Sequence, residues 1–159
     1  MPEMFPSMYR PEMHENQGKS QSGYPASLTA SFFLFIITAI LMMVAGLVLA
    51  TSGYTGPMDV DPSFRSAVVR NQKIVAIFNI VIALVISILA SQLRRGSTMS
   101  RRWLAIVVLV AVVGNLLAFV VKAGGFVLGI IPVLLAFAAL LMYTSAATAY
   151  FDRIRGLND

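Results

Sequence analysis

Four long apolar segments, rather than a short alternation of apolar and polar positions, dominate the chain after its first 28 residues. They lie at about residues 30–51, 72–93, 103–122 and 126–150. A helix rises 1.5 Å per residue, so roughly 20 apolar residues cross the ~30 Å hydrocarbon core of a bilayer. The pattern therefore predicts an all-α integral membrane protein with four transmembrane helices.

The polar breaks between these segments predict how the helices connect. Gly53, Gly56 and Pro57 end the first segment, and short connections join the second to the third and the third to the fourth. Short connections require antiparallel neighbours, so we expect an up-down-up-down four-helix bundle over residues 29–151. A short tail over residues 152–159 follows it.

Residues 1–28 form a polar N-terminal arm with four prolines and no helical or strand periodicity. Such composition is typical of a disordered or extended segment. Met4, Phe5, Met8 and Tyr9 give the arm an apolar edge, so it is either a docking arm or a plain flexible tail. A signal peptide is not indicated, because the apolar segment starts late and is too long.

Composition agrees with a membrane protein. Hydrophobic residues make up 58% of the chain and charged residues only 12%, whereas soluble domains average about 25% charged. The absence of cysteine excludes disulfides, thiol catalysis and cysteine-ligated metals. His14, the single histidine, lies in the arm and is too isolated to build a metal site or a catalytic pair.

The distribution of basic residues predicts the orientation. With the N-terminus inside, eight basic residues are cytoplasmic and four are external. The positive-inside rule then places both termini in the cytoplasm of a multi-pass plasma-membrane protein. The net charge is +5, and most of the basic residues flank the apolar segments. This placement favours contact with lipid headgroups over nucleic acid. The expected headgroup and interface anchors are Arg94, Arg95, Arg101, Arg102 and Trp103.

No ionisable residue lies in the interior of the four apolar segments. Proton relays, intramembrane proteolysis and lipid-phosphate chemistry need titratable or clustered basic groups at that depth. Asp59 and Asp61 lack the further oxygen ligands of a calcium loop. We therefore expect a protein that is not an enzyme, with no catalytic residue, cofactor or metal site.

The polar and small residues inside the segments point to helix packing. Asn79 and Asn115 must face other helices, because lipid cannot satisfy an amide. They are interpreted as interhelical contacts, with a polar patch for a quinone head or a partner helix as the alternative. Small residues at GxxxG-like spacing, which lets backbones approach, occur twice in the chain. These packing candidates are Gly46 with Ala50, and Gly125 with Gly129.

The stretch Leu93-Arg94-Arg95-Gly96, followed by Arg101-Arg102-Trp103-Leu104, resembles the basic loop of small four-span membrane proteins common in actinobacteria. The closing residues 145–155, with Tyr150-Phe151 before the last basic residues, are similar to theirs too. Some proteins of that layout look like accessory subunits of the actinobacterial cytochrome bcc–aa3 respiratory supercomplex. The resemblance implies such a role here and carries over no ligand or catalytic residue.

Two functions from different classes follow from these observations. The first is a non-catalytic accessory or assembly subunit that binds other integral membrane subunits and lipids, with the respiratory supercomplex as the specific candidate. The alternative is a small transporter component or homo-oligomeric carrier. Transporters often carry matching Gly/Pro interruptions in two halves of the chain. Here only the fourth segment is interrupted, by Pro132, which favours the accessory subunit.

Overall fold

The computed structural model describes residues 25–121, 123 and 125–156, and within that part of the chain every regular element is a helix. The all-α prediction is therefore confirmed. The predicted N-terminal arm up to residue 24, including His14, lies outside the described residues, as do Lys122 and the last three residues. The described helices are α1 (Ala26–Thr51), α2 (Pro62–Leu93), α3 (Thr98–Val120), α4 (Val127–Met142) and α5 (Ser145–Gly156).

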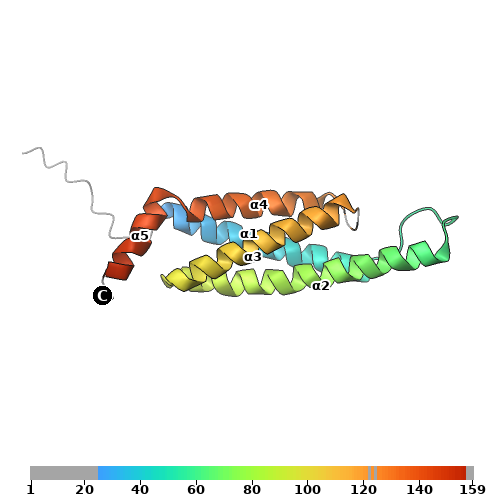
Figure 1. The fold of residues 1–159 in the computed structure, drawn as a ribbon, viewed down its shortest axis with the longest axis horizontal. Coiled ribbons are helices and arrows are strands. Elements are labelled where there is room, and N and C mark those ends of the chain that lie inside the picture. The colour runs from blue at the N-terminus through green and yellow to red at the C-terminus, as the bar shows by residue number, and fades with distance from the viewer. Residues whose placement is uncertain (1–24, 122, 124, 157–159) are drawn as a thin grey trace, which may run out of the picture.

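The first four helices pack around one core. Helix α1 lies against α2 and α4, and α3 lies against the same two helices from the other side. Figure 1 shows that successive helices run in opposite directions along the long axis and that α5 turns away at the end where α1 begins. The centre of the bundle is filled by buried side chains from all four helices, among them Phe35, Met42, Ile86, Leu104 and Leu135.

Helices α1, α2 and α3 are long and apolar enough to cross a membrane. Helix α4 reaches the required length only together with α5, to which it is joined at a bend of 53°. The described part of the chain thus has three candidate membrane spans, or four if α4 and α5 form one broken span. The outward faces of these helices are also apolar, as in helices that contact lipid. Both findings are consistent with a multi-pass membrane protein.

The helix ends differ from the bounds of two predicted spans. Helix α2 starts at Pro62, ten residues before the predicted start at residue 72. The predicted span 126–150 is not one helix, because α4 ends at Met142 and α5 starts at Ser145. Helix α5 also takes up residues 152–156 of the predicted tail. Hydropathy locates apolar residues but not helix ends, and both differences arise at helix ends.

Helix α1 approaches α2 closely at Gly46. A Cβ atom built on Gly46 would lie 2.8 Å from Cγ1 of Ile80 and 2.9 Å from the backbone oxygen of Ala76. The second of these atoms belongs to the α2 backbone and cannot move aside as a side chain can. Because the side chain of Gly46 is a single hydrogen atom, the two helices can pack at this short distance.

We predict that Gly46→Ala destabilises the folded protein by about 1–3 kcal/mol, because the added methyl group forces α1 and α2 apart. Thermal unfolding in detergent, followed by tryptophan fluorescence, measures the effect. Gly53→Ala is the control, since nothing lies within 4 Å of the Cβ position there. Equal melting temperatures for the two variants would show that the close approach does not limit stability.

The side chain of Arg101, from α3, holds the bend between α4 and α5. Its Nη2 donates hydrogen bonds to the carbonyl oxygen of Met142 and to Oγ1 of Thr148, each at 3.0 Å. The guanidinium carbon also lies 4.4 Å from the ring centroid of Tyr143 and 5.0 Å from that of Phe151. A helix end leaves carbonyl oxygens without backbone donors. Arg101 satisfies one at the end of α4 and connects it to α5.

A second contact fixes the same bend from the side of α1. Oγ1 of Thr144, in the bend, lies 3.0 Å from Oγ of Ser27, and Oγ1 also bonds the carbonyl oxygen of Leu141. Nearby, the buried Oγ of Ser31 donates to the carbonyl oxygen of Ala138 at 2.8 Å. The position of α5 therefore depends on contacts between residues more than 40 positions apart in the chain.

We predict that Arg101→Gln loosens α5, because a neutral amide loses both ring contacts and the charge-assisted bonds, which are worth about 1.5–3 kcal/mol each. Amide exchange over residues 145–153 is expected to accelerate at least about tenfold. The matched control is Arg102→Gln at the exposed neighbouring arginine. Unchanged exchange in the Arg101 variant would contradict the assigned role.

Candidate interaction site at the projecting end of α2

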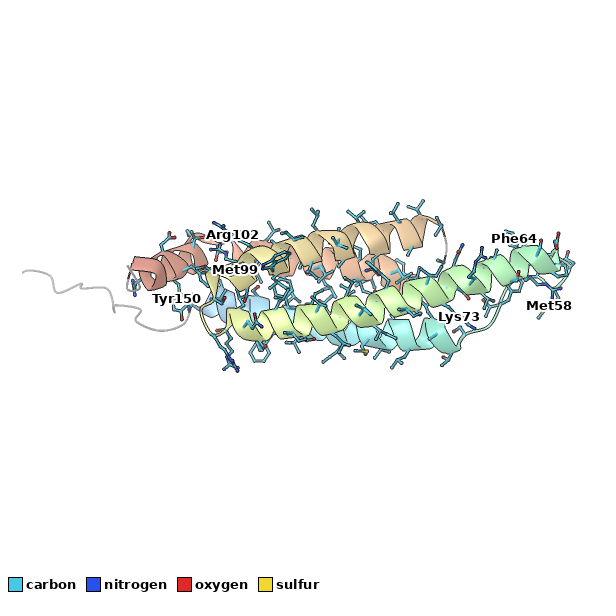
Figure 2. All side chains as sticks on the ribbon, turned by 60° about the horizontal axis from the view of Figure 1, so that its bottom comes forward. Met58, Phe64, Lys73, Met99, Arg102 and Tyr150 are labelled. Atoms are coloured by element: carbon cyan, nitrogen blue, oxygen red, sulfur yellow. The ribbon has the colours of Figure 1, made fainter. Side chains whose placement is uncertain are left out.

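The N-terminal end of α2 extends past the other helices. Helix α1 packs closely against α2 where Gly46 meets Ala76, and α1 ends five residues after Gly46. Asn71 of α2 lines a cavity together with Val121 and Ala123, just after the end of α3. Residues 62–70 therefore extend about 13 Å beyond the bundle. Figures 1 and 2 show this end projecting on its own. We call residues 52–73, which include the preceding loop, the projecting segment.

The start of the projecting helix is encoded locally. Asp61 is the N-cap: its Oδ1 accepts a hydrogen bond from the backbone N–H of Ser63 at 2.8 Å. Pro62 follows at the first helical position, where its missing N–H costs nothing. The hydrogen bonds from the backbone and side chain of Ser63 lower the pKa of Asp61 below 3.8. The Asp-Pro-Ser sequence was the signal for this early start, but a hydropathy pattern cannot detect it.

We predict that the start of α2 frays in acid. A carboxylate with a lowered pKa stabilises the helix at pH values above its ordinary 3.8, and this stabilisation is lost as the pH falls through the lowered value. Protection of the amides at residues 63–66 against hydrogen exchange should then drop. Asp61→Asn keeps a capping oxygen that does not titrate. If wild type and variant lose protection equally, the cap does not control the fraying.

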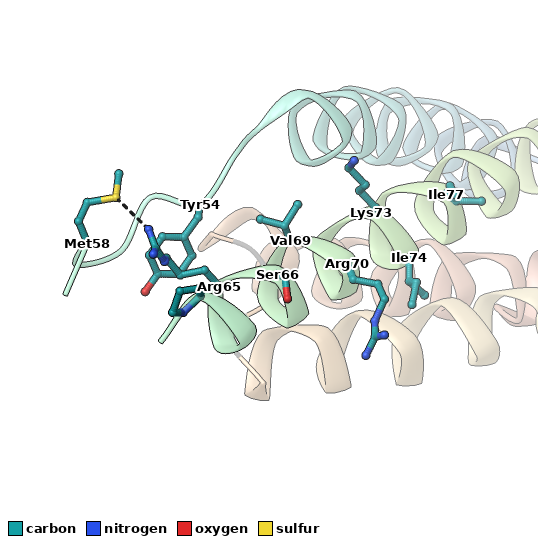
Figure 3. A pocket seen from close by; sticks show the side chains of 10 residues that line it. Tyr54, Met58, Arg65, Ser66, Val69, Arg70, Lys73, Ile74 and Ile77 are labelled. Carbon is teal, nitrogen blue, oxygen red and sulfur yellow. Dashed lines mark hydrogen bonds between the residues drawn. The ribbon is translucent and has the colours of Figure 1, made fainter. Parts of the chain in front are cut away.

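One face of the projecting segment forms an open groove of about 670 Å³, which we call the basic groove. Its cations are Arg65, Arg70 and Lys73, and its apolar wall includes Ile74 and Ile77. Figure 3 shows Arg70 and Lys73 extending in different directions from α2, and Arg65 reaching toward the preceding loop. Nη1 of Arg65 lies 3.7 Å from Sδ of Met58 there, whereas its Nε is buried without a hydrogen-bond partner.

The segment also lines a second cavity, of about 430 Å³, which we call the Phe64 groove. Oε1 of Gln72 is buried there and has no hydrogen-bond donor. The groove thus combines an aromatic ring with an amide oxygen that can accept a bond. It is lined by Tyr54, Thr55, Gly56, Phe64, Val68, Asn71, Gln72, Val121 and Ala123.

Two large apolar side chains of the projecting segment are exposed outside the bundle. Met58 is 71% exposed and Phe64 is 54% exposed. Exposed apolar residues on the spans, such as Ile77, need no partner because lipid covers them. Beyond the bundle lipid tails do not cover such side chains, so Met58 and Phe64 are the candidate contacts for a partner there.

The two predicted polar packing residues are buried but are not hydrogen-bonded to each other. Nδ2 of Asn79 donates to the carbonyl oxygen of Val75 at 3.0 Å, and Nδ2 of Asn115 donates to that of Ala111 at 2.9 Å. Both bonds stay within one helix. Oδ1 of each asparagine is buried without a partner. Neither residue lines one of the grooves described above.

The predicted small-residue pairs differ in their surroundings. Gly46 is buried at the α1–α2 contact, whereas Ala50 is exposed. A Cβ atom built on Gly129, in α4, would lie 3.4 Å or more from the ring of Phe119, which is an ordinary contact distance. Gly125 precedes α4 and has no atom within 4 Å of its Cβ position. Neither spacing motif therefore brings both of its residues to a close backbone approach.

The predicted anchors gather at the α2–α3 turn. Gly96 takes the left-handed conformation there, with φ of 80°, and its N–H donates to the carbonyl oxygen of Leu93. The side chains of Arg94, Arg95, Arg102 and Trp103 are exposed around this turn. Arg101 instead points into the bundle end and holds the α4–α5 bend. A role inside the fold was not evident from the sequence, since it depends on helices that are distant in the chain.

Among the described residues no three His, Asp or Glu side chains come together. Asp61, one of the two aspartates considered as calcium ligands, caps α2 through Ser63. The arrangement at the projecting segment is thus one of cations, apolar surface and one unpaired amide oxygen, which are groups suited to binding.

No protein-family model, characterised protein or solved structure matches this chain. The resemblance of its basic loop to actinobacterial four-span proteins therefore enters only the proposal that follows.

Proposed function

We propose that this chain is a non-catalytic accessory subunit that docks on a larger membrane complex through its projecting segment. In this proposal the protein is a four-helix, up-down-up-down bundle of the plasma membrane with both termini in the cytoplasm. The observation that carries the proposal is the projecting end of α2, with Met58 and Phe64 exposed beyond the bundle.

Most of the projecting helix lies beyond the ends of α1 and α3. A short helix in water is marginally stable without tertiary contacts. Here it is extended past the ends of α1 and α3 and carries an exposed aromatic ring. A partner surface that covers this ring would stabilise the helix and remove apolar area from water. Docking therefore accounts for both the length of α2 and the side chains at its end.

The Phe64 groove suits a protein partner. Leaving a buried acceptor unpaired costs about 1–3 kcal/mol, and Oε1 of Gln72 is such an acceptor. A partner that places an apolar side chain beside Phe64 would cover the exposed ring, and a shift of the groove wall on docking would open Oε1 of Gln72 to an N–H donor of the partner. The groove holds about 430 Å³, which is room for side chains rather than for a folded element.

The actinobacterial respiratory supercomplex is the first complex in which to seek the partner. The support for this choice is the resemblance carried by Arg94–Gly96 and Arg101–Leu104. The apolar segments, which have no ionisable residue in their interiors, fit a subunit that holds or spaces other subunits.

We predict that the chain co-purifies with a stoichiometric membrane partner in mild detergent and that Phe64→Ala reduces recovery of this partner about tenfold. An aromatic anchor at an interface typically contributes more than 1 kcal/mol, and often 2. Mass spectrometry of the purified material identifies and quantifies the partner.

The matched control is Phe137→Ala, which removes an equally exposed ring (58%) from the side of α4. Recovery should match wild type, because lipid or detergent covers that face. Purification of the wild-type chain without any stoichiometric partner would refute the accessory role. Equal recovery with both variants would refute docking through the Phe64 groove.

A further inference from the structure

Along α2 the residues that line the basic groove change from basic to apolar, which is the order expected where a helix passes from the headgroups into the acyl chains of a membrane. Arg65, Arg70 and Lys73 occupy the part that projects, and Ile74 and Ile77 continue the same face toward the bundle. Side chains 3, 4 and 7 positions apart share one side of a helix, so Arg70, Lys73, Ile74 and Ile77 form a continuous stripe. Charge therefore gives way to apolar surface within two helical turns.

The position of this change coincides with the end of the bundle. Helix α1 ends and α3 ends close to the level of Asn71 and Lys73, as the shared cavity at Val121 also shows. Only α2 continues past this level, so the apolar cross-section of the bundle ends here, and we place the boundary between hydrocarbon and headgroups at this level. Lys73 and Arg70 thus lie at headgroup depth, and Ile74 and Ile77 lie at the depth of the acyl chains.

The cations of the groove have not been neutralised within the fold. Among the described residues Arg70 and Lys73 have no ion pair or side-chain hydrogen bond. Asp61, a nearby carboxylate, is occupied by Ser63. Nε of Arg65 is buried and unpartnered. The groove therefore presents unpaired positive charge beside an apolar wall.

We infer that the basic groove is a binding site for an anionic phospholipid. Its headgroup would lie between Arg70 and Lys73, whose exposed side chains leave α2 in different directions and would turn toward the phosphate, with Arg65 on the outer side. An acyl chain would lie along Ile74 and Ile77. An inorganic phosphate would bind the cations but make no contact with the apolar wall. A zwitterionic lipid would contact the wall, but its headgroup has no net charge to attract the three cations. A lipid with a net negative headgroup uses both.

The test measures lipid preference in the purified full-length chain. The protein is placed in nanodiscs or mild detergent with phosphatidylglycerol and phosphatidylcholine of identical acyl chains, and retained lipid is quantified by native mass spectrometry. A basic residue near a membrane surface contributes roughly fivefold in affinity for anionic lipid. Wild type should therefore prefer phosphatidylglycerol at least about tenfold, and the double variant R70Q/K73Q should lose this preference.

The matched control is R95Q/R102Q, which removes two exposed arginines at the opposite end of the bundle. The control should keep the preference of the wild-type protein. Equal loss in both double variants would show a general effect of net charge and would overturn the site, as would an unchanged preference in R70Q/K73Q. The mutated side chains are exposed, and melting curves without added lipid confirm that both variants remain folded.

Two further measurements separate the lipid from other ligands. Glycerol 3-phosphate, a free phosphate monoester, should not displace phosphatidylglycerol, and displacement would assign the groove to a soluble anion. Ile77→Ser should weaken retention of phosphatidylglycerol several-fold, because the side chain is exposed on the wall. The site lies on a different face from the Phe64 groove and is tested without a partner protein. Its failure would therefore leave the accessory role standing, and the reverse also holds.

Discussion

Hydrocarbon offers no hydrogen bonds, and this constraint governs the structure from the backbone outward. In the apolar helices several polar side chains bond to carbonyl oxygens of their own helix, as Thr38 does with Leu34 and Asn115 with Ala111, whereas Ser31 of α1 bonds the carbonyl oxygen of Ala138 in α4. The one bend in the series of helices occurs where other side chains satisfy the freed groups. Arg101 and Ser27 meet the bend at residues 142–144, so it is stabilised by tertiary contacts rather than by its own sequence.

The same constraint makes the two buried asparagines notable. Each amide donates once to its own helix and leaves its oxygen unpaired in an apolar interior. Asn79 and Asn115 therefore contribute less interhelical bonding than their burial would suggest. The close contact between helices comes instead from small residues, above all Gly46 against the backbone at Ala76. Packing, not polar bonding, holds α1 to α2.

The two ends of the molecule differ in how they use charge. At the α2–α3 turn, Arg101 is hydrogen-bonded within the protein, while its exposed basic neighbours lie around Gly96. At the projecting end of α2, Arg70 and Lys73 remain unpaired beside apolar surface. The projecting segment thus offers two separate faces, one basic and one built around Phe64. A subunit with these two faces could contact a partner and a lipid at the same time.

The sequence alone determined the helical class and the approximate position of the apolar helices, because runs of apolar residues without charges have few alternatives in a membrane. It also contained the Asp61-Pro62 start of α2, although hydropathy could not reveal it. Tertiary structure decided the rest. The end of α4 at Met142, the close approach at Gly46 and the two grooves depend on side chains from different helices, and no local pattern specifies which distant residue will supply a hydrogen bond or leave a cation unpaired.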